Sequence, residues 1–245
     1  MKVSFARQVK EEVVFNDFDI CCQKAILSAI IKVNGTLSLS NQGLLLTIRT
    51  ENAKIASKVH KMLKEVYHPH IEFLVSRKMK LQKNNVYILK VSKAREILDD
   101  LGLMNGLGFH TLPDKKIIQK ECCKRAFLRG TFLAAGSISD PEKGYHLEIV
   151  CSRPLQAQQI LEILTEFEIE GRIVQRKKYY VVYIKEGAGI SDFLNVVEAH
   201  VALMEFENSR IVREVRNTVN RRVNCETANI TKTVTAAARQ VDDIL

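Results

Sequence analysis

The sequence predicts an α+β fold made of two copies of one αβαββα unit, arranged as a pseudo-dimer and followed by C-terminal helices. An internal repeat is the first reason: shifting the 245-residue chain by 101 positions places Cys21–Cys22 on Cys122–Cys123 and Gly35 on Gly136. The second is that each copy begins with a segment that is apolar on nearly every side, as an interior helix is. Solenoids repeat every ~20 to 50 residues, so this longer period favours two packed halves.

The elements of the two copies are expected in the same order. Interior helices are predicted at 19–33 and 120–134, each ended by a glycine in the left-handed conformation, Gly35 and Gly136. Strands with alternating apolar residues follow at 44–50 and 145–151, and helices at 52–66 and 153–166. Each copy then has a pair of strands, 71–78 with 86–91 and 172–176 with 180–185, before a closing helix at 92–101 or 189–198.

The repeat ends near residue 198, where the composition changes. We therefore divide the chain into a first repeat with an N-terminal helix (1–110), a second repeat (111–198) and a helical C-terminal segment (199–245). Within that segment we predict one helix at 199–218 and another from Cys225 onward. The second carries an apolar stripe of Ile230, Val234, Ala237, Val241 and Ile244.

The composition favours a compact protein with a polyanionic partner. Hydrophobic residues make up 46% of the chain, and the net charge is +9. Such a charge suits nucleic acid, which binds proteins with release of its counterions. No apolar run approaches the ~18 residues that span a bilayer, and the N-terminus lacks the apolar segment of a signal peptide. We expect a cytoplasmic, nucleoid-associated protein without membrane contact.

Six cysteines include two adjacent pairs, Cys21–Cys22 and Cys122–Cys123, with Cys151 and Cys225 elsewhere. We interpret them as small buried thiols, because neither CxxC nor histidine-rich spacing accompanies them. A four-thiolate zinc site built from the two pairs is the alternative. It is disfavoured because adjacent side chains on a helix point in different directions. We therefore expect neither a metal nor a cofactor.

Each interior helix resembles the motif of the LAGLIDADG homing endonucleases, in Leu27–Gly35 and Leu128–Gly136. The resemblance implies that the motif helices of the two halves pack closely, with small residues, here Ala29 and Gly130, at the contact. It also implies that the eighth motif residue is an acid holding a catalytic divalent metal. Asn34 and Ala135 occupy these positions, so we predict no catalytic residues and no enzyme activity.

A more specific resemblance, over almost the whole chain, is to the WhiA family of bacterial transcription regulators. The residues that carry it are Ser4–Phe5, Val9–Glu12, Cys122–Gly130, Tyr145–Glu148, Glu205–Arg210, Asn217, Asn220–Arg221, Asn224–Asn229 and Lys232–Thr233. The resemblance implies a DNA-binding regulator of cell division or sporulation genes, with a degenerate endonuclease-like domain before a helix-turn-helix. We expect the recognition helices of that last domain to be absent, with only its start present.

Double-stranded DNA is the expected partner, and three groups of cations are candidates for phosphate contacts. Two belong to the matching strand pairs, which form a saddle over DNA in LAGLIDADG proteins, and the third follows the late helix. They are Arg77, Lys78 and Lys80; Arg172, Arg176, Lys177 and Lys178; and Arg221 and Arg222. The alternatives are solvated turn residues in the strand pairs and, along the late helix, pairing of arginines with Glu207 and Glu214.

The sequence leaves a second function open. The former DNA saddle could dock another protein or a small ligand instead of DNA. Retardation of DNA by the chain at low and moderate salt distinguishes the two hypotheses.

Overall fold

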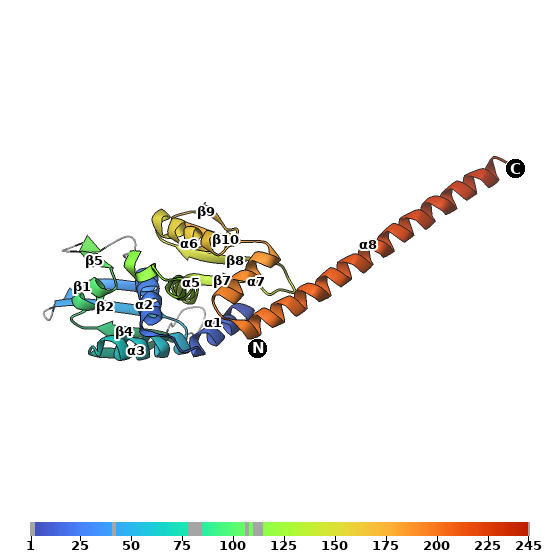
Figure 1. Cartoon of the computed structure of the whole chain (residues 1–245). Helices are drawn as coiled ribbons and strands as arrows, with labels where there is room; N and C mark the ends of the chain where they lie inside the picture. Colours follow the sequence, from blue (N-terminus) through green and yellow to red (C-terminus); the bar gives the residue numbers. More distant parts are fainter. Residues whose placement is uncertain (1–2, 41–42, 78–84, 106–107, 110–114, 245) are drawn as a thin grey trace.

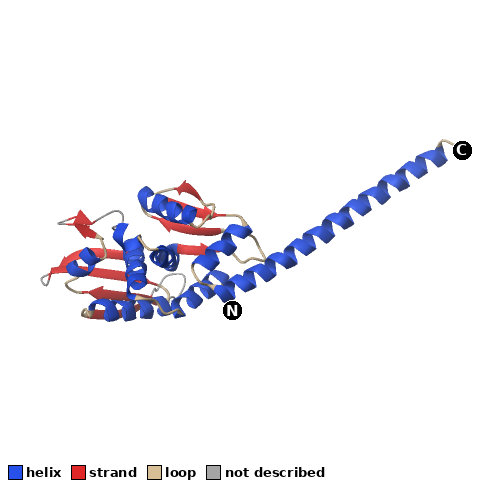
Figure 2. Cartoon of the chain, in the orientation of Figure 1, coloured by secondary structure: helices blue, strands red, loops and turns tan. Residues whose placement is uncertain are grey.

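The computed structural model describes all residues except 1–2, 41–42, 78–84, 106–107, 110–114 and 245. Two four-stranded sheets flank a central pair of helices, and one long helix leaves the body (Figures 1 and 2). The elements are α1 (Phe5–Phe15), α2 (Ile20–Asn34), β1 (Gly35–Ser40), β2 (Gly43–Thr50), α3 (Ala53–Tyr67), β3 (Ile71–Arg77), β4 (Asn85–Val91), α4 (Arg95–Asp100), β5 (Met104–Asn105), β6 (Gly108–Phe109), η1 (Lys115–Ile118), α5 (Glu121–Ala135), β7 (Gly136–Ile138), β8 (Leu147–Cys151), α6 (Pro154–Glu166), β9 (Arg172–Arg176), β10 (Tyr179–Ile184), α7 (Gly187–Val196) and α8 (His200–Asp242).

The two sheets have the same topology. Their strand orders are β1-β2-β4-β3 and β7-β8-β10-β9, with every neighbouring pair antiparallel. The registers also correspond, since Leu46 pairs with Leu37 and Val91 while Leu147 pairs with Ile138 and Ile184. The duplication inferred from the sequence is therefore confirmed, but the repeated unit is αββαββα and not αβαββα.

The missed strands, β1 and β7, begin at the glycines that end the motif helices. Gly35 has φ −83° and ψ 141°, and Gly136 has φ −76° and ψ 150°, so both are extended and the predicted left-handed conformation is wrong. Glycine is needed for space instead, because a Cβ at Gly35 would collide with the carbonyl oxygen of Ile31. Each helix passes directly into a strand, so no loop marks the boundary.

The motif helices α2 and α5 pack against each other in the centre of the molecule. Both are buried around most of their circumference, as the apolar sequences predict. A Cβ added at Gly130 would lie 2.7 Å from both the Cβ of Ala29 and the carbonyl oxygen of Ile26. The predicted close crossing at Ala29 and Gly130 is thus confirmed, and Gly130 allows the two backbones to approach this closely.

Helix α1 joins the C-terminal helices to the body. Val9 and Val13 of α1 are fully buried. The carboxylate of Glu12 accepts hydrogen bonds from the backbone N–H groups of Val201 and Ala202, at 2.7 and 2.9 Å. These groups have no partner within the first turn of α8, and an acid at a helix N-terminus also meets the favourable end of the helix dipole. Glu12 therefore caps α8 and fixes where it starts.

The long helix α8 replaces the two helices predicted for 199–218 and 225 onward. It continues without a break from His200 to Asp242, because no residue between the two predicted segments is proline or glycine. Ala202 and Phe206 anchor it in the core, and beyond Arg213 the described residues are exposed. The helix consequently projects from the body (Figure 1). Its predicted apolar stripe has no contact with the core among the described residues.

Among the described residues, none of the helices is long and apolar enough to cross a membrane.

The close helix crossing leads to a prediction about stability. Replacing Gly130 with leucine forces side-chain atoms into the contact between α2 and α5, and overpacking of this kind costs ~1 to 3 kcal/mol. We expect a lower midpoint of chemical denaturation for Gly130→Leu. The control is Gly144→Leu, because a Cβ at Gly144 meets nothing within 4 Å. Equal midpoints for the two variants would contradict the placement of Gly130.

Candidate nucleic-acid interface

The two degenerate acid positions lie where the motif helices end. Asn34 is the last residue of α2, and Ala135 is the last of α5. The Asn34 side-chain amide donates a hydrogen bond of 3.5 Å to the carbonyl oxygen of Ala134. The two positions at which the LAGLIDADG resemblance expects carboxylates therefore lie close together, and a neutral amide and a methyl group occupy them.

A cavity of about 620 Å³ opens beside Asn34. Its walls come from α1, the C-terminal ends of α2 and α5, the end of β2 and the start of α3. Among the described lining residues, Arg7, Lys10 and Arg49 carry positive charge and Glu51 carries negative charge. The excess of cations favours an anionic occupant, because it repels a divalent metal and attracts a phosphate.

Lys10 is the most deeply placed of these cations. Burial lowers the pKa of its ammonium group to about 8, and the Nζ lies 5.6 Å from the centre of the Phe132 ring. The group is therefore still mostly protonated at neutral pH, although it has lost much of its hydration. A desolvated cation gains more from a bound anion than a fully hydrated one does.

Arg7 is held in place by an acid on its own helix. Its Nε donates to Glu11 at 2.8 Å, and Glu11 also accepts a 2.5 Å hydrogen bond from Lys54 of α3. The hydrogen bond from Lys54, followed by that from Arg7, lowers the pKa of the Glu11 carboxyl. Glu11 offsets part of the charge of Arg7, so Lys10 and Arg49 supply most of the positive charge of the cavity.

The other acids near the motif helices in the sequence do not reach this cavity. Asp17 lies 3.6 Å from Lys58, and Asp19 is the N-cap of α2, at the opposite end of that helix. Asp140 accepts a hydrogen bond from the backbone of Glu142 in the loop after β7. The described residues thus provide no paired carboxylates at the motif position.

The second sheet carries exposed cations on one face. Arg172 and Arg176 alternate with Ile173 on β9 and so project to the side away from the core, into which Ile173 packs. Arg176 is partly neutralised by Glu148, at 3.2 Å. Lys177 and Lys178 form the exposed turn after β9, where Lys177 has a left-handed φ of 56°.

In the first sheet, Arg77 is the candidate cation that lies within the described residues. Phe73 contacts His60 of α3, and Arg77 shares the side of Phe73 because the two are four residues apart on β3. Arg77 itself is exposed at the end of β3, beside Asn85 of β4, and its contact with DNA stays a prediction. Lys78 and Lys80 lie outside the described residues. On the opposite face, Lys90 pairs with Glu72 at 3.3 Å.

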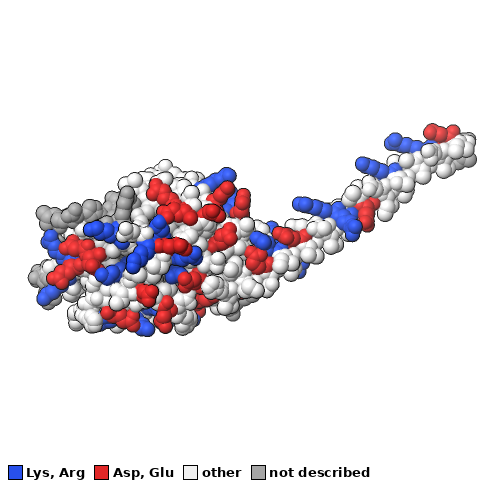
Figure 3. Space-filling view, in the orientation of Figure 1, with Lys and Arg blue, Asp and Glu red and all other residues white. Residues whose placement is uncertain are grey.

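Some arginines of α8 contact an acidic or aromatic side chain, and others are exposed to solvent. Arg210 lies 3.0 Å from Glu207, so the pairing alternative holds for this residue, and Arg213 lies 4.9 Å from the centre of the Tyr145 ring. Arg221 and Arg222 are exposed, with Arg222 only 4.0 Å from Glu226. In Figure 3 basic side chains stand out along this projecting helix, whereas acidic and basic side chains intermingle on the visible face of the body.

Sequence reasoning missed the cations of the cavity. Arg7 and Lys10 are three residues apart and therefore lie on neighbouring positions of α1, which was a usable signal. Nothing in their spacing indicates that α1 packs beside Asn34 and Arg49. That proximity arises only when α1 packs across the ends of the two repeats.

The comparisons with known proteins follow this division of the chain. The WhiA N-terminal LAGLIDADG-like domain matches residues 20–104, the WhiA LAGLIDADG-like domain matches 124–216, and the WhiA C-terminal HTH domain matches 219–245. The last match corrects the expectation that the helix-turn-helix domain is largely absent. Its matched residues form the exposed second part of α8, so in the described residues they appear as one continuous helix.

Solved structures support the same fold. The crystal structure of full-length DUF199/WhiA from Thermatoga maritima has a TM-score of 0.72 at 22% identity, covering 98% of this chain and 77% of that one. The structure of I-DmoI in complex with DNA and Mn has a TM-score of 0.50 at 14% identity, covering 73% of this chain and 97% of that one. At these identities the likeness shows the fold alone.

Sequence relatives are much closer. The probable cell division proteins WhiA of Bacillus cytotoxicus and Bacillus thuringiensis (strain Al Hakam) are each 46% identical over 245 residues. The match covers 99% of this chain and 78% and 77% of those proteins. With this identity over nearly all of its length, and with three WhiA domains matched in order, the chain belongs to the WhiA family.

Proposed function

We propose that this protein is a bacterial DNA-binding transcription regulator of the cell division or sporulation type, built on a homing-endonuclease scaffold without catalytic activity. The observation that carries the proposal is the cation-lined cavity beside Asn34, at the place where the resemblance expects metal-binding carboxylates. The match of residues 219–245 to a helix-turn-helix domain supports it independently. The protein would act in the cytoplasm, at the nucleoid.

The cations of the body would contact phosphates and not bases. Lys10 and Arg49 in the cavity, and Lys177 and Lys178 in the β9–β10 turn, can neutralise backbone charge, but charge alone carries no sequence information. Binding by the body should therefore be weak, with a dissociation constant of roughly 10⁻⁴ to 10⁻⁶ M at physiological salt, and nearly independent of sequence. Sequence preference would come from the helix-turn-helix segment.

The first test measures the salt dependence of DNA binding. If Arg176, Lys177 and Lys178 contact phosphates, their replacement by glutamine should reduce the slope of log affinity against log salt by up to ~2.7, at ~0.9 for each phosphate that is no longer neutralised. Fluorescence anisotropy of a labelled duplex provides the slope. The control has the same change in charge at Lys61, Lys64 and Lys143, which are exposed and outside the candidate surfaces.

A comparison of surfaces extends this test. Arg221→Gln with Arg222→Gln probes the projecting helix, and Lys10→Gln with Arg49→Gln probes the cavity. If only the Arg221 and Arg222 changes alter the slope, DNA is bound by the C-terminal segment, and the surfaces of the body become candidates for docking a protein or ligand. If none of the three groups alters it, the proposal of phosphate contacts at these residues is wrong.

A second prediction concerns catalysis. Supercoiled plasmid and chromosomal DNA should remain intact with the protein and magnesium or manganese, because Asn34 and Ala135 offer no anionic oxygen to hold a divalent ion. Agarose electrophoresis at increasing protein concentration checks this. Site-specific nicking that disappears when Asn34 is replaced by alanine would overturn the assignment of the scaffold as inactive.

A third prediction separates binding from stability at Lys10. Because burial lowers the pKa of Lys10 to about 8 in the fold, against 10.5 as the ordinary value, the charged form destabilises the folded protein at neutral pH. Lys10→Met should therefore unfold at a higher urea concentration than the wild type at pH 7. The advantage should diminish as the pH rises from 8 to 10.5, where the wild-type lysine becomes neutral in both states.

The same variant should bind DNA more weakly at pH 7. Lys61→Met, which removes an exposed lysine on α3, is the matched control and should show neither effect. A Lys10→Met protein that gains stability while retaining full DNA affinity would show that Lys10 is not a DNA contact.

A further inference from the structure

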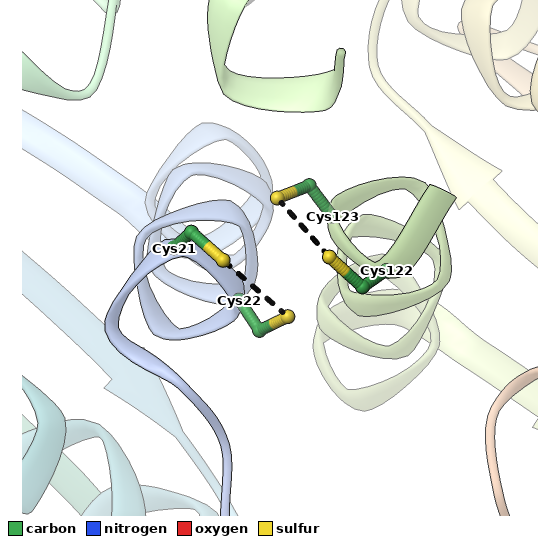
Figure 4. A group of neighbouring side chains, drawn as sticks. All are labelled: Cys21, Cys22, Cys122 and Cys123. Atoms are coloured by element: carbon green, nitrogen blue, oxygen red, sulfur yellow. Dashed lines mark hydrogen bonds between the residues drawn. The ribbon is translucent and has the colours of Figure 1, made fainter. Parts of the chain in front are cut away.

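The two adjacent cysteine pairs, separated by about 100 residues in the sequence, converge at one point of the structure. Cys21 and Cys22 lie in the first turn of α2, and Cys122 and Cys123 lie in the first turn of α5. All four sulfur atoms lie within 4.8 Å of one another. Figure 4 shows the thiols pointing into the space between the ends of the two helices.

The expectation that adjacent thiols diverge is wrong at this position. Side chains on a helix tilt towards its N-terminus, and in the first turn no preceding turn lies in their way. Both thiols of a pair can therefore project past the end of the helix. The sulfur atoms of Cys21 and Cys22 are 4.0 Å apart, and those of Cys122 and Cys123 are 3.9 Å apart.

These separations match a single tetrahedral metal ion. A zinc ion bound to four thiolates at about 2.3 Å holds the sulfur atoms roughly 3.8 Å from one another. Within each adjacent pair the sulfur atoms lie within a few tenths of an ångström of that value, and the other separations, which reach at most 4.8 Å, would shorten by up to about 1 Å on binding. An iron–sulfur cluster distributes its four thiolates over more than one iron and so needs them farther apart.

The surroundings favour the negative charge of such a site. Four thiolates around one zinc ion carry about two net negative charges. Two helix N-termini, each with the positive end of its dipole, meet at the cluster, and neither has a side-chain cap. The positive charge of Lys120 acts on Cys21, and that of Arg129 interacts with Cys22.

The four thiols are partly buried and partly accessible to solvent. Cys22 and Cys123 are buried, Cys21 is half-buried and Cys122 is exposed, so an ion can enter from solvent and then be largely enclosed. The predicted burial of all six thiols is therefore wrong for Cys122, and also for Cys225, which is exposed on α8.

Soft thiolate ligands in tetrahedral arrangement select zinc over the hard ions magnesium and calcium.

We propose that Cys21, Cys22, Cys122 and Cys123 form a structural zinc site that joins the N-termini of the two motif helices. Binding replaces the protons of the thiols, so one zinc ion enters and up to four protons leave. No oxidation or reduction takes place. The site would fix α2 and α5 to each other at the end opposite to Asn34 and Ala135.

The test uses the full chain, purified without a histidine tag, freed of metal by a chelator under reducing conditions and titrated with cobalt(II). We expect the intense visible absorption of tetrahedral cobalt–thiolate coordination, saturating at one ion per chain and abolished by added zinc. Zinc should also raise the melting temperature of the metal-free protein. Absence of this absorption, or saturation only with several weakly bound ions, would overturn the proposal.

The variants identify the ligands. Cys122→Ser changes an exposed thiol and should lower the affinity for cobalt by more than ~100-fold, since even changes outside the ligand shell cost about 10 to 100-fold. Cys21→Ser gives a second, independent test if that protein is poorly folded. Cys225→Ser is the matched control, being an exposed cysteine outside the cluster, and should titrate like the wild type.

A further measurement distinguishes metal binding from oxidation. Native mass spectrometry of protein isolated from cells without added reductant should show one bound zinc ion. After denaturation in acid, which releases the ion and returns the protons to the thiols, the protein mass should show none of the loss of two hydrogens that marks each disulfide. Disulfide bonds among the four cysteines, with no bound zinc, would show that these cysteines are oxidised and do not bind a metal, and the proposal would be wrong.

Discussion

The close packing of α2 against α5 is the contact on which the rest of the structure depends. Gly130 presents no side chain to Ala29, so the two helices approach to a distance that any larger residue at this point would prevent. Because each helix passes directly into the first strand of its own sheet, this contact also sets how the two sheets are placed. It therefore determines the geometry of both helix ends.

Those two ends have opposite chemistry. At the C-terminal ends, Asn34 and Ala135 lie beside a cation-lined cavity, and the charge there favours an anionic partner. At the N-terminal ends, four thiols converge where the helix dipoles favour negative charge. One end of the helix pair is thus suited to a phosphate and the other to a thiolate-bound cation. Packing at Gly130 places the residues of both.

The cavity contains a cation that lowers the stability of the fold. Lys10 loses hydration when α1 packs over Phe132, and its lowered pKa records that loss. An apolar residue in its place would pack without this cost. A bound anion explains the presence of a buried cation that lowers stability more readily than packing does. The exposed cations of β9 and α8 do not lower the stability of the folded state in this way.

The internal repeat in the sequence determined the two halves. Local apolar periodicity, which depends only on neighbouring residues, determined the interior helices and most strands. The resemblance to the LAGLIDADG motif identified Asn34 and Ala135 and the close contact of Ala29 with Gly130. Tertiary structure decided the rest. The position of α1 beside Asn34, the side on which Arg77 lies and the convergence of Cys21–Cys22 with Cys122–Cys123 all depend on contacts between segments far apart in the chain. Spacing along the sequence does not fix such distances, because the packing of the helices and sheets brings these residues together.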